Sequence, residues 1–385
     1  MENKNEEKKI KYKLCSLAGG KVIISGEHSV VYGKPAIAFN IDKYTKMDLI
    51  GYESSISFNS FASINLINLT KQLTISKSEL IDIIEDKTTL DNERDKYKKH
   101  IIFILKIICK ELLNSNILNG NINKDCIKTF INNHYFTVSI SSEFPIGFGL
   151  GSSAAYNVCI VNGIFNLIKS IIGKNFYSED KIILLSNEGE KIFHNGTPSG
   201  IDVYCSFSGG IIFFKNMNDK RIVTIPHQNF FLEKIKFLLI DTKIQRNSGD
   251  FIHIVSDYKK NNFKEFNDSI NNIEIVTNKI IKLITKEKSD ENDCSEFFDL
   301  IKQNQKLLKK ICVSNDEIDR IINILEKNGF VGKISGAGGG GFIIAFVLKE
   351  KIKDLIELLN ENEIKYMEVN TSKEPAKIIN LEIFK

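Results

Sequence analysis

Glycines at alternate positions precede an apolar segment in the stretch PIGFGLGSSAA, residues 145–155. Glycine lets backbone amides approach an anion closely, because no Cβ stands in the way. A helix that begins after this stretch adds unpaired N–H groups and the positive end of its dipole. Ser152 and Ser153 could cap that helix and still offer hydroxyls to a ligand or to Mg²⁺. The stretch therefore predicts a cradle for a phosphate group.

Three other interpretations of these glycines compete with the phosphate cradle. A Walker A loop needs a lysine before its serine or threonine, and no lysine follows Gly151. The Rossmann pattern matches at Gly149, Gly151 and Ala154. That pattern expects an acidic residue about 20 positions further on to bind ribose, and none occurs between Glu143 and Glu179. A loop that is glycine-rich only for a tight turn stays as the third alternative.

Four stretches resemble, in the same order, the motifs of the GHMP kinases, the family of galactokinase and of homoserine, mevalonate and phosphomevalonate kinases. The N-terminal motif, which contains GEHSVVYGKPAIA, is most similar to that of the mevalonate kinases. The resemblance implies transfer of the γ-phosphoryl group of ATP to the C5 hydroxyl of mevalonate, with Mg²⁺ as cofactor. The four stretches are AGGKVIISGEHSVVYGKPAIA (18–38), PIGFGLGSSAA (145–155), GEKIFHNGTPSGID (189–202) and KISGAGGGGF (333–342).

The resemblance also implies roles for individual residues. Asp202, at the end of PSGID, is the expected catalytic group that accepts the proton of the hydroxyl. Lys21 would hold Asp202 ionised and stabilise charge on the transferred group. Glu190 and Ser153 are the expected Mg²⁺ ligands, since Mg²⁺ takes a few hard oxygens together with phosphate. The expected ATP contacts are Pro145, Gly147, Gly149, Leu150, Gly151, Ser152, Ser153 and Ala154, and the expected substrate contacts are Lys21, Glu27, His28, Asp202, Thr242, Gly336 and Ala337.

Two of these assignments depend on the resemblance alone, and two positions depart from the family pattern. Without the resemblance, Glu190 would belong to a solvated helix face and Lys21 to the exposed edge of a strand. Gly19 replaces a common proline, which would loosen a turn before Lys21. Glu190 and Asp202 are one residue further apart than expected, and we place the extra residue in HNGTP, 194–198.

Two other functions stay open at the sequence level. One is a different GHMP kinase, such as a phosphomevalonate or sugar-1-phosphate kinase. The other is a catalytically silent protein of the same fold that senses a nucleotide. The presence of Lys21, Glu190 and Asp202 argues against the silent protein, because all the groups that phosphoryl transfer needs are there.

The elements that must position these residues predict an α+β fold in two domains. The resemblance implies an N-terminal domain (1–225) like ribosomal protein S5 domain 2 and a C-terminal ferredoxin-like domain (226–385). Hydrophobic patterning predicts strands at 12–16, 21–25, 36–50, 135–141, 209–214 and 236–241, and two strands that flank 335–341. We expect the turn LAGG between the first two strands, a loop at 285–295, and helices at 93–114, 152–168, 178–194, 248–258, 263–284, 296–312, 315–328 and 350–361.

Composition excludes several classes of partner. The 385 residues carry 52 basic and 48 acidic side chains, a balance that argues against nucleic acid and anionic membranes. No apolar run approaches the roughly 20 residues that cross a bilayer, and the first residues lack the apolar core of a signal peptide. The seven cysteines are dispersed without a CxxC motif, which indicates free thiols in a reducing compartment. We therefore expect a cytoplasmic protein, and the family resemblance implies a homodimer.

Overall fold

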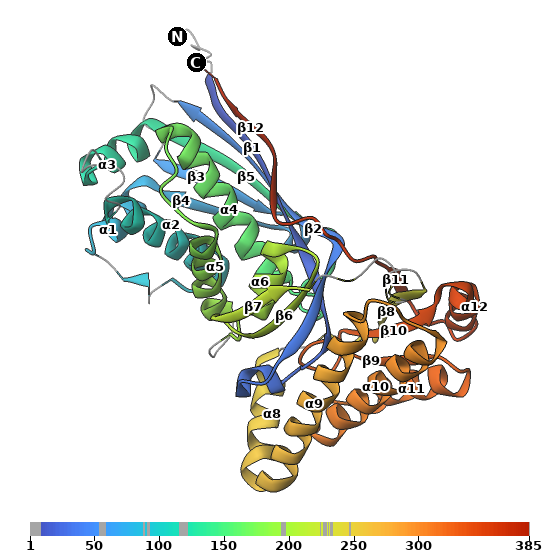
Figure 1. Cartoon of the computed structure of the whole chain (residues 1–385). Coiled ribbons are helices and arrows are strands. Elements are labelled where there is room, and N and C mark those ends of the chain that lie inside the picture. Colours follow the sequence, from blue (N-terminus) through green and yellow to red (C-terminus); the bar gives the residue numbers. More distant parts are fainter. Residues whose placement is uncertain are drawn as a thin grey trace.

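Two β-sheets, each covered by helices, make up the part of the chain that the structure describes (Figure 1). Both ends of the chain lie together at one end of the first sheet. The structure is a computed structural model. It describes residues 9–384 apart from 54–58, 88, 91–92, 115–121, 194–197, 224, 226–228, 230, 232–233 and 246–247.

The first sheet is mixed and has the strand order β12-β1-β2-β5-β3-β4, with β6 beside β2 and β7 beside β6. Its pairs are antiparallel except for β3 with β5. The long antiparallel pair of β1 and β2 extends from this sheet toward the second one (Figure 1). The strands are β1 (Lys9–Ser25), β2 (Ala36–Glu53), β3 (Ser60–Leu66), β4 (Lys71–Ser76), β5 (His134–Ser142), β6 (Ile211–Asn216), β7 (Asp219–Ile222) and β12 (Lys377–Ile383).

Helix α4 (Ser152–Ile172) packs against β1 and β2 and fills the centre of this domain. It is long and apolar enough to cross a membrane by length and composition, yet 61% of its apolar window is buried inside the fold. It is therefore the core helix that the sequence predicts after the glycine loop. The other helices of this domain are α1 (Lys77–Ile84), α2 (Lys96–Asn114), α3 (Lys124–Asn133), α5 (Glu179–Phe193) and α6 (Ile201–Ser208).

The second sheet is antiparallel, with the strand order β11-β8-β10-β9, and the later helices pack around it (Figure 1). Its buried residues form a second hydrophobic cluster. The elements are β8 (Ile235–Asp241), α8 (Ser248–Asn261), α9 (Phe263–Ile284), α10 (Glu291–Lys310), α11 (Asp316–Lys327), β9 (Val331–Ile334), β10 (Phe342–Leu348), α12 (Ile352–Glu361) and β11 (Tyr366–Glu368). Short 3₁₀ helices in the described part of the chain occupy Ser29–Tyr32, Ile67–Leu69 and Lys349–Lys351.

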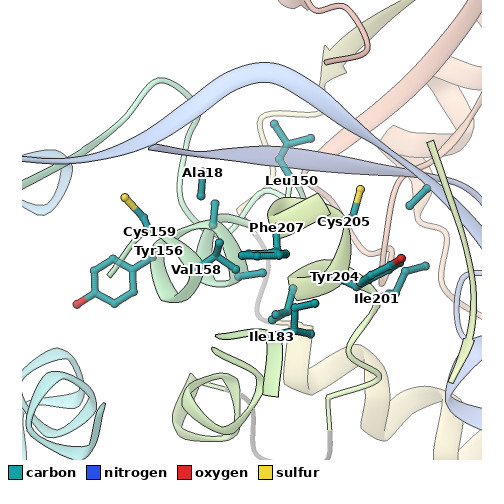
Figure 2. Close-up of a cluster of buried hydrophobic side chains, with 14 of the residues drawn as sticks. Ala18, Leu150, Tyr156, Val158, Cys159, Ile183, Ile201, Tyr204, Cys205 and Phe207 are labelled. Carbon is teal, nitrogen blue, oxygen red and sulfur yellow. The ribbon is translucent and has the colours of Figure 1, made fainter. Parts of the chain in front are cut away.

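A cluster of buried side chains supports the glycine loop from below (Figure 2). Leu150 is fully buried, and it inserts from the loop between residues of α4, such as Val158, and residues of α6, such as Cys205. An apolar side chain anchored in this way fixes the position of the amides on either side of it. The core thus holds the loop in place without a ligand.

The predicted turn LAGG is wrong, because β1 runs without a break from Lys9 to Ser25. Its pairing with β2 shifts between Gly19 and Lys21, which is the signature of a β-bulge. A Cβ on Gly19 would lie 2.3 Å from the side-chain oxygen of Asn40. The glycine that replaces a proline therefore makes room for Asn40 and does not loosen a turn.

Two other local predictions differ from the structure. Helix α10 begins at Glu291, inside the predicted loop 285–295, because Asp290 and Asp293 form a capping box there. Neither Ser152 nor Ser153 caps α4, whose N-cap is Gly151 in the left-handed conformation. Helix α11 has Asn315 as its N-cap, whose side chain accepts a hydrogen bond from the amide of Ile318.

The last strand of the chain crosses the expected domain division. Strand β12 comes from the C-terminal end but pairs with β1 in the first sheet, where Tyr12 lies opposite Ile383. The proposed division between 225 and 226 lies next to 226–228, outside the described residues. After the second unit the chain returns to the first sheet as β12. The second unit is therefore joined to the first at both of its ends.

Candidate active site

The loop between β5 and α4 presents its backbone to a cavity of about 440 Å³. Gly151 has a φ of +70°, a conformation that disfavours other residues. A Cβ at Gly151 would lie only 2.8 Å from the Cγ atom of Lys21, so a side chain there would displace the lysine. The amide of Lys21 donates to the carbonyl of Leu150 over 2.9 Å. Loop and β1 are therefore held in direct contact.

Lys21 and Asp202 form an ion pair inside this cavity. The Nζ atom of Lys21 lies 3.2 Å from Oδ1 of Asp202 and 3.2 Å from the carbonyl of Gly149. The lysine side chain is 3% exposed and the aspartate 35%, so the carboxylate faces the cavity while the ammonium lies behind it. Asp202 is in the first turn of α6, which the αL residue Gly200 precedes. A carboxylate held by a cation in this way is able to accept a proton from a hydroxyl.

Ser153 and Glu190 meet at the lining of the same cavity. The hydroxyl of Ser153 donates to Oε2 of Glu190 over 3.0 Å. The amide of Asn157 donates to Oε1 of the same carboxylate over 2.6 Å. Glu190 is 2% exposed on α5, so its orientation is set by these partners and not by solvent. The expected pair of oxygen ligands is therefore brought together.

This pair of oxygens fits a magnesium ion. Mg²⁺ is usually held by one or two carboxylates together with substrate phosphates, and not by a cage of protein ligands. Among the described residues no group of three or more His, Cys, Asp or Glu side chains could hold a metal. One carboxylate and one hydroxyl beside a phosphate cradle match the magnesium pattern and not that of zinc.

His28 connects the N-terminal motif to the second glycine run. The Nε2 atom of His28 lies 3.0 Å from the carbonyl oxygen of Ala337, so this nitrogen carries the hydrogen. His28 has a φ of +57°, an unusual conformation for a residue with a side chain. Strained backbone of this kind is concentrated at functional sites. Gly336 and Ala337 line the cavity beside it.

Glu27 is engaged in a buried ion pair. Its Oε1 atom contacts the ammonium of Lys333 on β9, and both side chains have no exposed surface. The amide of Asn304 donates to Oε2 over 3.1 Å. Burial lowers the pKa of Lys333, and the carboxylate of Glu27 opposes that shift. Glu27 therefore fixes the wall of the cavity, and Lys333 is a partner that sequence reasoning missed.

Most of the expected site residues line one cavity, but four do not. Pro145, Leu150, Ala154 and Thr242 are absent from its lining. Leu150 and Ala154 are fully buried, and Thr242 donates its hydroxyl to the carbonyl of Gly341 over 2.8 Å. The expected residues that line the cavity are Lys21, Glu27, His28, Gly147, Gly149, Gly151, Ser152, Ser153, Glu190, Asp202, Gly336 and Ala337.

We place the extra residue between Glu190 and Asp202 in 194–198, and of these positions 194–197 lie outside the described residues. The two carboxylates nevertheless reach the same cavity. Glu190 contacts Ser153, and Asp202 contacts Lys21. The additional residue therefore leaves both contacts intact.

Lys96 and Tyr97 line the cavity outside the four motifs and were missed, and so was Phe193 inside the third motif. Lys96 begins α2 and donates to the carbonyl of Phe193 over 2.8 Å. Burial lowers the pKa of Lys96, and the charge of Glu190 partly offsets the shift. The rings of Tyr97 and Phe193 lie 5.4 Å apart beside it. The segment before α2 is polar and unpatterned, so only the fold reveals that these residues reach the site.

Comparisons with known proteins agree with this geometry. Residues 121–210 match the N-terminal domain of GHMP kinases, and residues 281–365 match the C-terminal domain. The mevalonate kinase of Methanocaldococcus jannaschii is 29% identical over 90% of this chain and 95% of its own length. That of Arabidopsis thaliana is 28% identical over 88% of this chain and 92% of its own length.

A solved structure supports the same family. A crystal structure of a mevalonate kinase superposes with a TM-score of 0.69 and 26% identity, covering 94% of this chain and 99% of that one. The phosphate cradle, the Lys21–Asp202 pair and the Ser153–Glu190 pair lie in one cavity of this fold. With both family domains matched, the chain belongs to the GHMP kinase family of ATP-dependent small-molecule kinases.

Proposed function

We propose that this chain transfers the γ-phosphoryl group of ATP to the C5 hydroxyl of mevalonate and yields 5-phosphomevalonate and ADP. The observation that carries the proposal is the 3.2 Å ion pair of Lys21 and Asp202, whose lysine lies against the glycine loop. The relatives named above are mevalonate kinases, and this chain matches each of them along nearly its whole length. A likeness of that extent supports the same acceptor for this chain.

The residues divide the reaction among them. Asp202 accepts the proton of the hydroxyl while the hydroxyl oxygen forms its bond to the γ-phosphorus and the bond to ADP breaks. Lys21, held behind Asp202, stabilises negative charge on the transferred group. The amides of Gly147, Gly149 and Gly151 hold the phosphates against the start of α4.

Magnesium would supply neutralisation of the phosphate charge when it is bound. Glu190 and Ser153 are the residues of this chain that would hold it. His28, fixed by its bond to Ala337, stands where it can orient the acceptor. The acceptor would then lie between the N-terminal motif and the second glycine run.

One assay tests the proposed acceptor. Purified protein with Mg-ATP is offered mevalonate, phosphomevalonate, homoserine or galactose in separate reactions, and release of ADP is followed. We expect release with mevalonate alone. Release with another acceptor would assign a different GHMP kinase activity, and no release with any of the four would refute the proposal.

Three further expectations, on the domain division, the compartment and the oligomeric state, are part of the same proposal. The chain divides functionally into 1–225 and 226–385, it works in the cytoplasm, and it forms a homodimer. Light scattering of the purified protein checks the dimer. A mass equal to that of one chain across the concentrations of the kinase assay would contradict it.

A further inference from the structure

A line of buried polar groups runs from α2 through α4 to the carboxylate of Glu190. Asn157 on α4 is fully buried, and so is His100 on α2. Asn157 donates both amide hydrogens, one to the carbonyl of Ser153 over 2.9 Å and one to Oε1 of Glu190 over 2.6 Å. Its side-chain oxygen contacts Nε2 of His100. Three helices are therefore linked behind the proposed metal site.

The directions of these bonds follow from the inventory of donors. The amide nitrogen of Asn157 has two hydrogens, and both are used. Its oxygen must therefore accept, and the hydrogen on Nε2 of His100 is the donor. His100 is then the neutral tautomer with a hydrogen on Nε2, and its buried Nδ1 atom has no hydrogen-bond partner among the described residues. Leaving this buried acceptor unpaired reduces the stability of the folded state.

The surrounding residues keep this line in place. A Cβ on Gly189 would lie 2.1 Å from the oxygen of Asn157 and 2.7 Å from Nε2 of His100. Only glycine at this position lets α5 approach the pair. The ring of His100 lies 4.8 Å from that of Phe193 and 5.2 Å from that of Tyr156. The imidazole therefore has a fixed orientation.

Each oxygen of Glu190 has its own donor. Oε1 accepts from Asn157 and Oε2 accepts from Ser153. Two donors on opposite oxygens define the plane of a carboxylate, and the remaining lone pairs then point in fixed directions. Partners behind a metal ligand commonly set its orientation and the affinity of the site.

We propose that His100 and Asn157 are positioning residues that orient the carboxylate of Glu190 for the divalent cation. The proposal rests on the proposed function, because that function makes Glu190 a metal ligand. Neither residue lines the cavity, so neither touches substrate. They act on the metal site alone. His100 orients the amide of Asn157, and Asn157 orients the carboxylate of Glu190.

The test measures Mn²⁺ affinity by electron paramagnetic resonance with a non-hydrolysable ATP analogue bound. Asn157→Leu and His100→Phe each remove one donor, and we expect Mn²⁺ to bind about 10- to 100-fold more weakly. His100→Gln restores an N–H donor and is expected to restore the affinity. Asn162→Leu is the matched control, a buried asparagine of α4 whose side-chain oxygen accepts a hydrogen bond from Asn166 on the same helix.

Unchanged Mn²⁺ affinity in both Asn157→Leu and His100→Phe would overturn the proposal. If Asn157→Leu does not fold, the comparison of His100→Phe with His100→Gln still tests the proposal. If His100→Phe does not fold, the comparison of Asn157→Leu with Asn162→Leu still tests it. Equal weakening in His100→Gln and His100→Phe would also overturn it, because rescue by a donor is what positioning requires. The kinase proposal fails separately, by the absence of ADP release from mevalonate in wild-type protein.

Discussion

At the residue scale, the Lys21–Asp202 pair makes a sharp prediction. Asp202→Asn keeps the shape of the side chain but removes the group that accepts the proton. We expect kcat to fall by about 10²- to 10⁴-fold, with the dissociation constant for the ATP analogue unchanged. Steady-state kinetics and nucleotide titration measure the two quantities.

A carboxylate of similar type on the surface provides the control. Asp257 on α8 pairs with Lys260, and its side chain is 66% exposed. Asp257→Asn is expected to keep the wild-type kcat. Activity of Asp202→Asn within a few-fold of wild type would contradict the role assigned to the carboxylate.

His100 makes the stability of the protein depend on pH. Burial lowers the pKa of His100 from 6.5 to about 4, although its bond to Asn157 opposes the shift. Between these values the unfolded chain binds more protons, so the free energy of unfolding falls as the pH falls. The loss from this group amounts to about 3 kcal/mol. It is complete below the folded pKa and absent above the unfolded one.

Denaturant unfolding of wild type and His100→Gln across this pH range measures the effect. Subtracting the variant removes the contribution of His134, whose pKa burial also lowers. We expect the advantage of wild type over the variant to shrink as the pH decreases from 6.5 toward 4. A constant difference between the two proteins would show that His100 does not titrate as its burial implies.

The sequence predicted residues that line the cavity but not the ones that hold them in place. Asp202, Lys21, Ser153 and Glu190 stand in motifs, and all four line the same cavity. The residues behind them are joined across the chain, since Lys333 contacts Glu27 from 306 positions away. Contacts at such separations leave no local pattern, so a single sequence does not reveal them.

At the element scale, periodicity predicted the long helices better than the boundaries between elements. The apolar helix after the glycine loop is confirmed as α4. The turn at 17–20 was inferred from two adjacent glycines, but tertiary pairing with β2 overrode that local signal and kept β1 extended. The early start of α10 depends on Asp290 and Asp293, a capping box inside a stretch that composition alone marks as solvated.

The two ends of α4 allow a matched test of the glycine loop. Gly151 and Gly173 flank the helix with φ values of +70° and +74°. Alanine at either position costs about 1–2 kcal/mol of backbone strain. The new Cβ at Gly151 would meet Lys21, at 2.8 Å, whereas no atom of the described residues lies within 4 Å of a Cβ at Gly173.

We therefore expect both variants to lose the stability that backbone strain costs, but only Gly151→Ala to change the kinetics. Gly151→Ala displaces Lys21 from Asp202 and is expected to lower kcat/KM by about 10²-fold. Gly173→Ala should keep the wild-type value. Equal activities for the two variants, measured alongside their unfolding midpoints, would show that contact between the loop and Lys21 is not needed.

At the scale of the whole molecule, a buried polar network joins the two units. Ser25, at the end of β1, shares a hydrogen bond with Thr277 of α9 over 2.7 Å and donates to Asn304 of α10 over 3.1 Å. Asn304 in turn donates to Glu27, which pairs with Lys333. The N-terminal motif is thus bonded to both helices and to β9 of the second unit. These bonds hold the two walls of the active-site cavity against each other.

Removing one member of the buried ion pair tests this connection. Lys333 also donates to the carbonyl of Ile334 over 2.6 Å, so its ammonium has several partners. Lys333→Met leaves Glu27 charged and buried without its cation, and we expect a loss of about 3–5 kcal/mol in the free energy of unfolding. The exposed pair of Lys260 and Asp257 provides the comparison, because Lys260→Met should cost less than about 1 kcal/mol.

The double variant Glu27→Gln with Lys333→Met separates an unpaired charge from lost packing. A neutral side chain no longer needs the ammonium, so the double variant should be more stable than Lys333→Met alone. Because the pair joins the two units, Lys333→Met should also weaken binding of mevalonate, measured by its KM. If Lys333→Met unfolds at the same denaturant concentration as Lys260→Met, the buried pair does not hold the units together, and the cavity walls are fixed by apolar packing alone.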